Sequence, residues 1–381
     1  MKGVNKENIK KYALNEFLTE YKELNTDNKY RPVAVGRYGI RRRESIYSKE
    51  LAKDYSKNKL IHKDTLTVGM GSKQIDIGIL IEDENFAVSP AYHTYKIQGI
   101  RCKYLEYCLQ SKNIEMFSLY AKRGSRQGKS IDLKRWLTYK IPVYSEEDQI
   151  VIEENLNKIN VVIELRRKQL ELLDELVRAR FVEMFGDVQD AKKHRSIQLK
   201  DICNTVTGGT PSTKHVEYYN GTIPWISTVS LGPNYIDGTT AKAFITQEAV
   251  DNSSTKIIPS GSILFGTRVG VGKSSINQVE MCTNQDIVAI IDLDESKYNK
   301  LYIKYVLDTY QSYFDSIKKG ATILGISSDD LKNIYVPDAS LYEQDRFEKF
   351  VKQIDKSRSR IQKSLEASQE LFDSLMQEYF G

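Results

Sequence analysis

The sequence predicts a mixed α/β protein in which two globular segments alternate with two long helices, and the helices pair as an antiparallel coiled coil with pseudo-twofold symmetry. The main observation is a repeat: residues 145–186 and 340–381 align at a constant offset of 195 (340 minus 145), and both end in Phe-Gly. The segments before them also correspond, more loosely. We therefore divide the chain into a first globular domain (1–144), a central helix (145–186), a second globular domain (187–339) and a C-terminal helix (340–381).

Both long segments carry the start and stop signals of helices. Ser145 with Asp148, and Ser340 with Glu343, have the spacing of a capping box, in which the serine accepts an N–H of the first turn. Neither segment contains Pro or Gly before its last residue, and that residue is glycine, which permits the left-handed turn that closes a helix. Helices of about 40 residues would each be about 60 Å long, which is typical of a coiled coil or a spacer.

The apolar residues of both segments recur at steps of three and four. Spacing of this kind forms the seam of two paired helices. Arg166 interrupts the seam in the first segment, and Arg358 and Ser368 interrupt it in the second. Two unrelated helical hairpins, each buried in its own domain, would not explain caps that share the same offset. The seam residues are Ile152, Leu156, Ile159, Ile163, Leu170, Leu173, Val177, Phe181 and Met184, and in the copy Phe347, Val351, Ile354, Ile361, Leu365, Phe372, Met376 and Tyr379.

The globular segments repeat the same order of elements. Residues 61–69 align with 258–266, each as a turn leading into a short strand with a glycine-rich tip. A further strand, a helix, a glycine-containing loop and an Asp-Leu-Lys turn follow in both copies. The whole chain is thus one α/β unit plus a long helix written twice, and a repeat of this size outweighs any single motif. The strands are expected at 86–88 and 286–291, and the helices around 104–109 and 301–306.

Composition narrows the class of protein. Of the 381 residues 40% are hydrophobic and the net charge is +5, which suits a globular, mildly basic protein and permits nucleic acid as a partner. No apolar run has membrane-spanning length and the N-terminus does not resemble a signal peptide, so we expect a cytoplasmic protein. The four cysteines lack a C-x-x-C pair and the four histidines lack ligand spacing, so no metal site is predicted.

Catalytic motifs were sought and none fits. The stretch from Gly266 to Ser274 nearly matches a phosphate-binding loop, but Thr267 stands where the template needs glycine, and the residues that follow are poor helix formers. A hairpin tip is the favoured interpretation. No signature of a nucleophile, of a dinucleotide or S-adenosylmethionine site, or of amino-group methyl transfer is visible. The sequence therefore predicts a binding protein without a cofactor of its own.

The loops are rich in groups that bind nucleic acid. Residues 208–214 and 218–227 bring hydroxyls, a lysine and aromatics together in the second domain, and residues 37–43 and 123–129 are basic clusters in the first. Arginine and lysine pair with phosphates or guanine, and amides pair with adenine. For any single basic residue a solvated surface is the alternative, so the clusters as sets carry the prediction of DNA contact.

Three motifs of the second domain resemble the target recognition domain of type I restriction–modification specificity subunits. They are Gly208–Thr213 followed by Tyr218–Ile226, Gly261–Arg268 with Gly272 and Lys273, and a closing pattern from Gly320 to Gln344. The resemblance covers the whole chain, because that family also alternates two recognition domains with two long helices. The first domain departs from the pattern: Arg31–Gly36 stands where Gly-Gly-Thr-Pro is expected, so its assignment depends on the repeat.

The resemblance implies a division of labour. Each recognition domain would read one half of a bipartite, asymmetric double-stranded DNA site, and the helix pair would set the unread spacer between the halves. Two methyltransferase subunits would modify an adenine in each half, and motor-nuclease subunits would cut unmodified DNA. S-adenosylmethionine, ATP and Mg²⁺ are expected on those partners and none in this chain, which is expected to be non-catalytic.

Thirteen residues are the candidates for DNA contact. An alternative from another class is a coiled-coil scaffold that binds protein without reading DNA, and a second is a nucleotide-dependent enzyme using the near-phosphate loop. The candidates are Arg37, Tyr38, Arg41, Arg42, Lys73, Arg123 and Arg126 in the first domain, and Lys214, Tyr218, Tyr219, Trp225, Arg268 and Lys273 in the second. A core position is an equal alternative for Trp225.

Overall fold

The chain folds into two units that each combine a globular part with part of both long helices. Unit 1 comprises Met1–Lys168 and Gln362–Gly381, and unit 2 comprises Gln169–Ile361. The predicted division treated each helix as a separate segment, whereas the contacts divide each helix between the units. The computed structural model describes residues 4, 9–36, 39–46, 54–126, 129–186, 196–320 and 323–381, without the side chains of 123–126 and 129.

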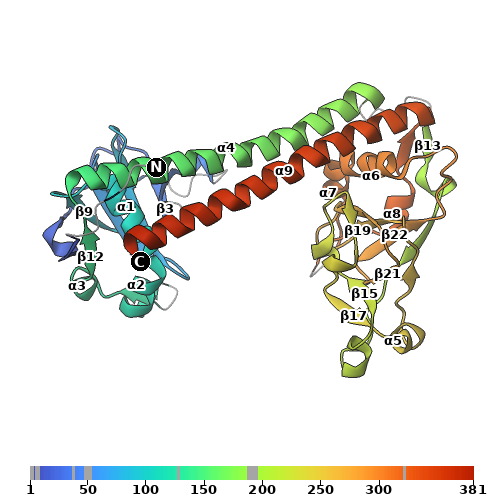
Figure 1. Ribbon diagram of the computed structural model, residues 1–381, viewed down its shortest axis with the longest axis horizontal. Helices are drawn as coiled ribbons and strands as arrows, with labels where there is room; N and C mark the ends of the chain where they lie inside the picture. The colour runs from blue at the N-terminus through green and yellow to red at the C-terminus, as the bar shows by residue number, and fades with distance from the viewer. Residues whose placement is uncertain are drawn as a thin grey trace. The chain divides into compact units, whose positions relative to one another are not determined.

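The two long helices are as predicted. Helix α4 spans Glu146–Phe185 and helix α9 spans Leu341–Phe380, and Figure 1 shows each as one unbroken helix, α4 in green and α9 in red. Gly186, directly after α4, has a φ of 76°, which is the left-handed conformation expected of a glycine that closes a helix.

The predicted caps form at both helix starts. The Asp148 N–H donates to the Ser145 hydroxyl at 3.2 Å, and the Glu343 N–H donates to the Ser340 hydroxyl at 3.3 Å. The second cap is also closed in the reverse direction, because the Ser340 N–H donates to the Glu343 carboxylate at 3.2 Å. These bonds satisfy N–H groups that have no partner inside the helix.

In unit 1 the helices run antiparallel. Asn155 of α4 donates to the Tyr379 hydroxyl at 3.2 Å, and Arg166, further along α4, donates to the Ser368 hydroxyl, earlier in α9. Arg166 and Ser368 are both interruptions of the apolar seam. Because Arg166 and Ser368 bond to each other, their polar groups have hydrogen-bond partners within the helix pair.

In unit 2 the helices α4 and α9 also run antiparallel. Asp174 of α4 pairs with Arg358 of α9 at 2.5 Å, and Phe181 packs edge-on against Phe347 with ring centroids 5.4 Å apart. Arg358, the remaining interruption of the seam, is therefore neutralised by a carboxylate of the opposite helix. A polar pair at a single level of a helix seam is a known means of specifying register.

Unit 1 is built on an antiparallel four-stranded sheet in the order β2-β9-β6-β7. Helices α1 and α2 cover this sheet, and Tyr104, Met116 and Trp136 are fully buried in the core. Strand β7 shows why the sheet forms, since Ile75 and Ile77 face the core at alternate positions. The strands and helices of unit 1 besides α4 and α9 are β1 (Lys10–Ala13), β2 (Leu18–Tyr21), β3 (Val33–Gly36), β4 (Gly39–Arg42), β5 (Lys59–Ile61), β6 (Thr65–Met70), β7 (Ile75–Leu80), β8 (Phe86–Val88), β9 (His93–Ile97), α1 (Cys102–Ser111), α2 (Asn113–Tyr120), β10 (Ala121–Arg126), β11 (Lys129–Ile131), α3 (Leu133–Trp136) and β12 (Lys140–Val143).

Unit 2 contains a five-stranded sheet in the order β14-β22-β19-β20-β16 and a four-stranded sheet in the order β17-β15-β21-β18. Helix α6 packs on the first sheet and buries Tyr302 with Phe265 and Phe314. The strands and helices of unit 2 besides α4 and α9 are β13 (Ser196–Gln198), β14 (Asn204–Thr207), β15 (Ile223–Ile226), β16 (Tyr235–Ile236), β17 (Ala243–Ile245), α5 (Gln247–Asp251), β18 (Ile257–Ile258), β19 (Ile263–Gly266), β20 (Ser274–Asn277), β21 (Met281–Thr283), β22 (Ile287–Ile291), α6 (Lys300–Thr309), α7 (Gln311–Ile317), α8 (Ser328–Lys332) and β23 (Tyr335–Pro337).

The internal repeat extends to the topology. The strand order β2-β9-β6-β7 of unit 1 recurs as β14-β22-β19-β20 in unit 2, the pair β5–β8 recurs as β18–β21, and β1–β12 recurs as β13–β23. The predicted class, two α/β units with a pair of long helices, is therefore confirmed. Between the shared strands unit 1 carries the pair β3–β4, and unit 2 carries β15, β16 and β17. The copies therefore share a scaffold and differ in what is built on it.

A buried glutamine attaches each globular part to its long helix in the same way. Gln149 donates to the Tyr144 carbonyl at 2.9 Å and accepts the Arg101 N–H at 3.2 Å. In unit 2, Gln344 donates to the Ala339 carbonyl at 2.9 Å and accepts a backbone N–H at the start of α6 at 2.8 Å. The glutamines are 4% and 0% exposed. They are separated by the repeat offset of 195, so the repeat preserves this structural joint.

Candidate nucleic-acid interface

The tip between β19 and β20 presents two of the predicted DNA-binding cations on a fixed backbone. The Gly266 N–H donates to the Lys273 carbonyl at 2.9 Å, and the Gly272 N–H donates to the Gly266 carbonyl at 3.1 Å. Gly270 and Gly272 have φ angles of 73° and 90°, which side chains rarely tolerate. Arg268 and Lys273 are exposed on this rigid tip, so their side chains are available to a ligand.

The tip is a hairpin and not a phosphate-binding loop, as the sequence indicated. Strand β20 follows it and pairs with β19 in antiparallel register, Phe265 with Ser274. A phosphate-binding loop would lead into a helix whose N-terminus faces the phosphate. The nucleotide-dependent alternative therefore loses its structural basis at this position.

The glycine-rich loop of the second domain lies against a turn that the sequence analysis did not single out. The Gly209 N–H donates to the Thr283 carbonyl at 2.8 Å, and a Cβ on Gly208 would lie 2.1 Å from Thr283 Oγ1. Thr210 directly follows Gly209, and Gln285 comes two residues after Thr283. Both are exposed, and a hydrogen bond joins their side chains. Because no side chain fits there, the two glycines bring these segments into backbone contact.

The same turn reaches the β19–β20 tip. The Thr267 N–H donates to the Asp286 carbonyl at 2.8 Å, and the Arg268 guanidinium lies 3.4 Å from an Asp286 carboxylate oxygen. Arg268 is 54% exposed and Asp286 is 15% exposed. The turn, residues 283–286, thus joins two motifs that are far apart in the sequence into one edge, on which Thr210, Gln285 and Arg268 are neighbours.

The predicted aromatic contacts of unit 2 belong largely to its interior. Tyr218 is 8% exposed in a small core with Ile245 and Cys282, which corrects its placement among the DNA-contacting residues. The Trp225 ring is half-buried against Tyr219, and its N–H donates to the Gly209 carbonyl at 3.0 Å. Trp225 therefore helps to hold the glycine-rich loop in place through this hydrogen bond.

Of the two remaining predicted residues of the glycine-rich loop region, Tyr219 packs within the protein and Lys214 faces solvent. Tyr219 is half-buried and donates to the Pro211 carbonyl at 2.7 Å, which fixes the loop conformation. Lys214 is exposed in the same loop. Lys214, Arg268 and Lys273 are thus the predicted residues of unit 2 whose charged groups face solvent.

In unit 1 the β6–β7 tip and the end of β3 both lie close to the Asp76 carboxylate. A Cβ on Gly71 would lie 2.6 Å from Asp76 Oδ1, and a Cβ on Gly36 would lie 4.0 Å from the same atom. Gly71 belongs to the β6–β7 tip that carries exposed Lys73, and Gly36 is the last residue of β3. This tip is the counterpart of the β19–β20 tip of unit 2.

Several predicted residues of unit 1 cannot be placed at the site. Arg37 and Tyr38 lie outside the described residues, and so do the side chains of Arg123 and Arg126, whose backbone forms part of β10. Arg41 is exposed on β4. The list of contacts in unit 1 therefore stays a prediction for these residues.

Arg42 is already engaged within unit 1. Its guanidinium lies 2.6 Å from a Glu84 carboxylate oxygen and 5.4 Å from the centre of the Phe86 ring. To bind a phosphate it would have to give up the carboxylate, although the pair is half-exposed and of modest strength. Arg42 is therefore a weaker candidate than Lys73.

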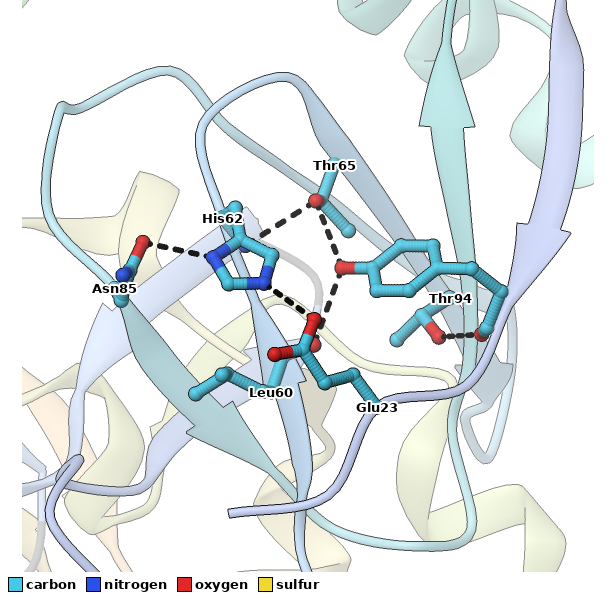
Figure 2. A network of polar contacts seen from close by, with 7 residues as sticks. Glu23, Leu60, His62, Thr65, Asn85 and Thr94 are labelled. Atoms are coloured by element: carbon cyan, nitrogen blue, oxygen red, sulfur yellow. Dashed lines mark hydrogen bonds and ion pairs between the residues drawn. The ribbon is translucent and has the colours of Figure 1, made fainter.

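A polar network around His62 has a structural role (Figure 2). The two ring nitrogens lie 2.8 Å from a Glu23 carboxylate oxygen and 3.0 Å from the Asn85 side-chain oxygen. The Tyr21 hydroxyl lies 2.9 Å from the Thr65 hydroxyl, and burial raises the pKa of Tyr21. Because both nitrogens are occupied, His62 holds these segments together and offers no open ligand position.

Among the described residues, no three His, Cys, Asp or Glu side chains gather as a metal-binding group. In the same part of the chain no helix combines the length and the apolar character needed to cross a bilayer.

The cysteines should react slowly with thiol reagents in the folded protein. Burial raises the pKa of the Cys102, Cys108 and Cys203 thiols to about 12 and that of Cys282 to about 11. Because the thiolate is the reactive species, alkylation at pH 8 should be roughly a thousandfold slower than in denaturant, where the pKa returns to about 8.5. Mass spectrometry of iodoacetamide adducts with and without guanidinium would measure this, and rapid labelling of any cysteine in the native protein would contradict it.

Two α/β units with the same core strand order that carry basic and hydroxyl-rich loops, together with two long helices, define a class of protein: a duplicated α/β protein with a pair of long helices. Comparison with known proteins specifies the family. The model of the type I restriction modification DNA specificity domain matches residues 192–369. The second half of the chain is thus similar to that domain, and the resemblance to type I specificity subunits is confirmed.

Individual relatives agree. The type I restriction enzyme MjaIX specificity subunit of Methanocaldococcus jannaschii is 34% identical over 150 residues, which are 39% of this chain and 35% of that relative. The EcoR124I/EcoR124II specificity subunit of Escherichia coli is 31% identical over 183 residues, 45% of this chain and 44% of that relative. The matched region thus spans less than half the length of either relative.

The fold is shared over the whole chain. The crystal structure of a type I restriction–modification system S subunit from M. genitalium superposes with a TM-score of 0.55 at 16% identity, covering 100% of this chain and 98% of that one. A chain from a study of complex assembly and conformational transition of the type I R-M system gives a TM-score of 0.58 at 14% identity, with 100% and 99% covered.

Proposed function

We propose that this chain is the non-catalytic specificity subunit of a type I restriction–modification complex and that each unit reads one half of a bipartite, asymmetric DNA site. The observation that carries the proposal is a shared scaffold with unlike loops. Strand order and the glutamine joints are the same in both units, whereas the exposed edge of unit 2 carries Thr210, Gln285 and Arg268 and that of unit 1 carries Lys73. Similar folds with different edge groups suit two different half-sites.

The long helices would set the spacer between the half-sites. Each is 40 residues long, or about 60 Å at about 1.5 Å per residue, and neither contains a proline or an internal glycine that would bend it. The polar pairs of Arg166 with Ser368 and of Asp174 with Arg358 oppose sliding of one helix along the other. A spacer fixed in this way would be unread in sequence and constant in length.

The proposed partners follow from the type I system. Two methyltransferase subunits would bind S-adenosylmethionine and modify the N6 of an adenine in each half-site, and a motor-nuclease subunit would use ATP and Mg²⁺ to cut unmodified DNA. Base modification of this kind requires the target adenine to leave the stack, and that pocket belongs to the methyltransferase. The chain itself would act in the cytoplasm as the DNA-reading component.

The test is to coexpress the chain with the methyltransferase subunits of its system. The purified complex should protect a bipartite site from nuclease digestion, and single-molecule sequencing of the host genome should show methylated adenine in both halves of one motif. The methyltransferase alone is the matched control and should leave the motif unmethylated. A coiled-coil scaffold without DNA readout predicts the same complex with no protection and no motif, and that result would overturn the proposal.

A further inference from the structure

Three apolar side chains are exposed at the loop edge of unit 2. Val269 lies on the β19–β20 tip, and Ile323 and Leu324 lie in the loop between α7 and α8; they are 50%, 55% and 56% exposed. Large apolar groups left in water at neighbouring positions mark surfaces that another molecule covers. Val269 lies within the stretch Gly266–Ser274, and Ile323 and Leu324 lie within the closing pattern Gly320–Gln344, but none of the three is among the thirteen candidates for DNA contact.

The two loops are held together by their backbones. The Ile326 N–H donates to the Thr267 carbonyl at 2.8 Å, and a Cβ on Gly325 would lie 2.8 Å from Arg268 Cγ. Close approach of this kind requires a glycine at position 325. Leu324 is therefore fixed beside Arg268, on the same edge as the turn at 283–286.

The surroundings of the apolar residues are cationic. Arg268, Lys273 and Lys319 are exposed on the same two loops, and the acidic partner of Arg268, Asp286, lies 3.4 Å away. An apolar group bordered by cations complements the major groove of DNA, where phosphates flank the thymine 5-methyl group. The charges favour DNA over an apolar protein surface as the molecule that covers this edge.

The corresponding loop of unit 1 has a different composition. Both loops follow the second helix of their unit, α2 or α7, and precede a short helix, α3 or α8. Both loops begin with basic residues before a glycine, Lys122-Arg123-Gly124 in unit 1 and Lys318-Lys319-Gly320 in unit 2. After this glycine the sequence carries Arg126 and Lys129 in unit 1, and Ile323 and Leu324 in unit 2. A loop that keeps its place in the fold and changes from basic to apolar after its glycine is suited to give each unit its own base preference.

We propose that Ile323 and Leu324, together with Val269, contact thymine methyl groups in the half-site read by unit 2. The inference rests on the proposed function, since it names the chemical group that this edge of unit 2 reads. It adds an apolar element to an interface that the sequence described in terms of charged and hydroxyl groups alone.

Deoxyuridine substitution tests the contact directly. The half-site read by unit 2 is identified first, as the one at which the Arg268→Ala variant changes base preference. Each thymine of this half-site is then replaced in turn by deoxyuridine, which keeps base pairing and removes the methyl group. Binding by the complex of the full chain with its methyltransferase subunits should weaken about fourfold at one or two positions, the effect of exposing one buried methyl-sized group. The Ile323→Ala/Leu324→Ala complex should lose the deoxyuridine effect at each position that Ile323 or Leu324 contacts.

The control is Val279→Ala. Val279 is 39% exposed in the turn before β21, at the opposite end of that strand from residues 283–286, and this variant should keep the full deoxyuridine effect. Thermal unfolding of all variants checks that they fold.

The inference would be overturned if no position were sensitive to deoxyuridine, or if the complex with the double variant were as sensitive as the complex with the wild-type chain. It would also be overturned if the double variant failed to assemble with the methyltransferase, because the residues would then belong to a protein contact. Failure of the proposed function would look different, because the unsubstituted complex would then show no sequence preference at all.

Discussion

Replacing Phe347 by alanine should lower the free energy of unfolding of unit 2 by about 3–5 kcal/mol, the usual cost of removing a fully buried phenyl group. Phe347 is 0% exposed, and its ring centre lies 5.4 Å from that of Phe181, 5.7 Å from that of Phe185 and 5.1 Å from that of Tyr305. This aromatic cluster joins α4 and α9 to α6. Its loss would leave a cavity at the joint between the helix pair and the globular part of unit 2.

Chemical denaturation monitored by circular dichroism would measure the loss. Phe244→Ala is the matched control, because Phe244 is 43% exposed on β17 and should cost less than about 1 kcal/mol. Phe181→Ala should be comparable to Phe347→Ala, and the double variant should lose less than the sum, since residues in contact share their interaction energy. Equal losses for Phe347→Ala and Phe244→Ala would mean that the cluster does not hold the helices to the domain.

Replacing Arg268 by alanine should relax the preference of the assembled complex at one position of one half-site, at a cost of about 1–3 kcal/mol for the preferred base pair. The reason is that Arg268 is exposed on a rigid tip and oriented by Asp286. Asp286→Asn keeps the size of the side chain and removes its charge, so it should disturb the orientation of Arg268 and reproduce part of the same relaxation. Binding to a panel of single-base-pair variants of the site would measure both effects.

Lys273→Ala is the comparison that separates base reading from phosphate binding. Lys273 projects from the same tip, and loss of one phosphate contact should weaken all sequences alike and reduce the slope of log affinity against log salt by about 0.9. If Arg268→Ala and Lys273→Ala both left affinity and preference unchanged, the β19–β20 tip would not be part of the interface.

The long helices could be predicted because their signals are local. A capping serine and its acid are three residues apart, and seam residues recur every three or four residues, so the pattern that forms each helix lies within one stretch of sequence. The repeat then extended the prediction to the domains, and the shared strand order bears this out. Strands β15, β16 and β17 of unit 2 have only two to four residues each, and the periodic pattern does not reveal them.

The candidate interface was predicted less well, for physical reasons. Arg268 and Lys273 could be placed on an exposed hairpin tip because glycines mark it, whereas the turn at 283–286 carries no local signal in the sequence. Its importance comes from β21 and β22, which bring it against Gly208–Thr210 and against Arg268. Tyr218 shows the opposite error: tyrosine suits both wet surfaces and cores, and the packing of β17 and α5 decides for the core.

The sequence by itself determined the duplicated plan, the caps and the seam of the helix pair, the resemblance to type I specificity subunits and the basic and glycine-rich loops. The tertiary structure decided which of those loops meet. Strand pairing brings the segments around residues 209, 268, 285 and 324 to one edge of unit 2, and glycines at their contacts let the backbones touch. Contacts between residues so distant in the chain depend on register and burial, which no local pattern of side chains encodes.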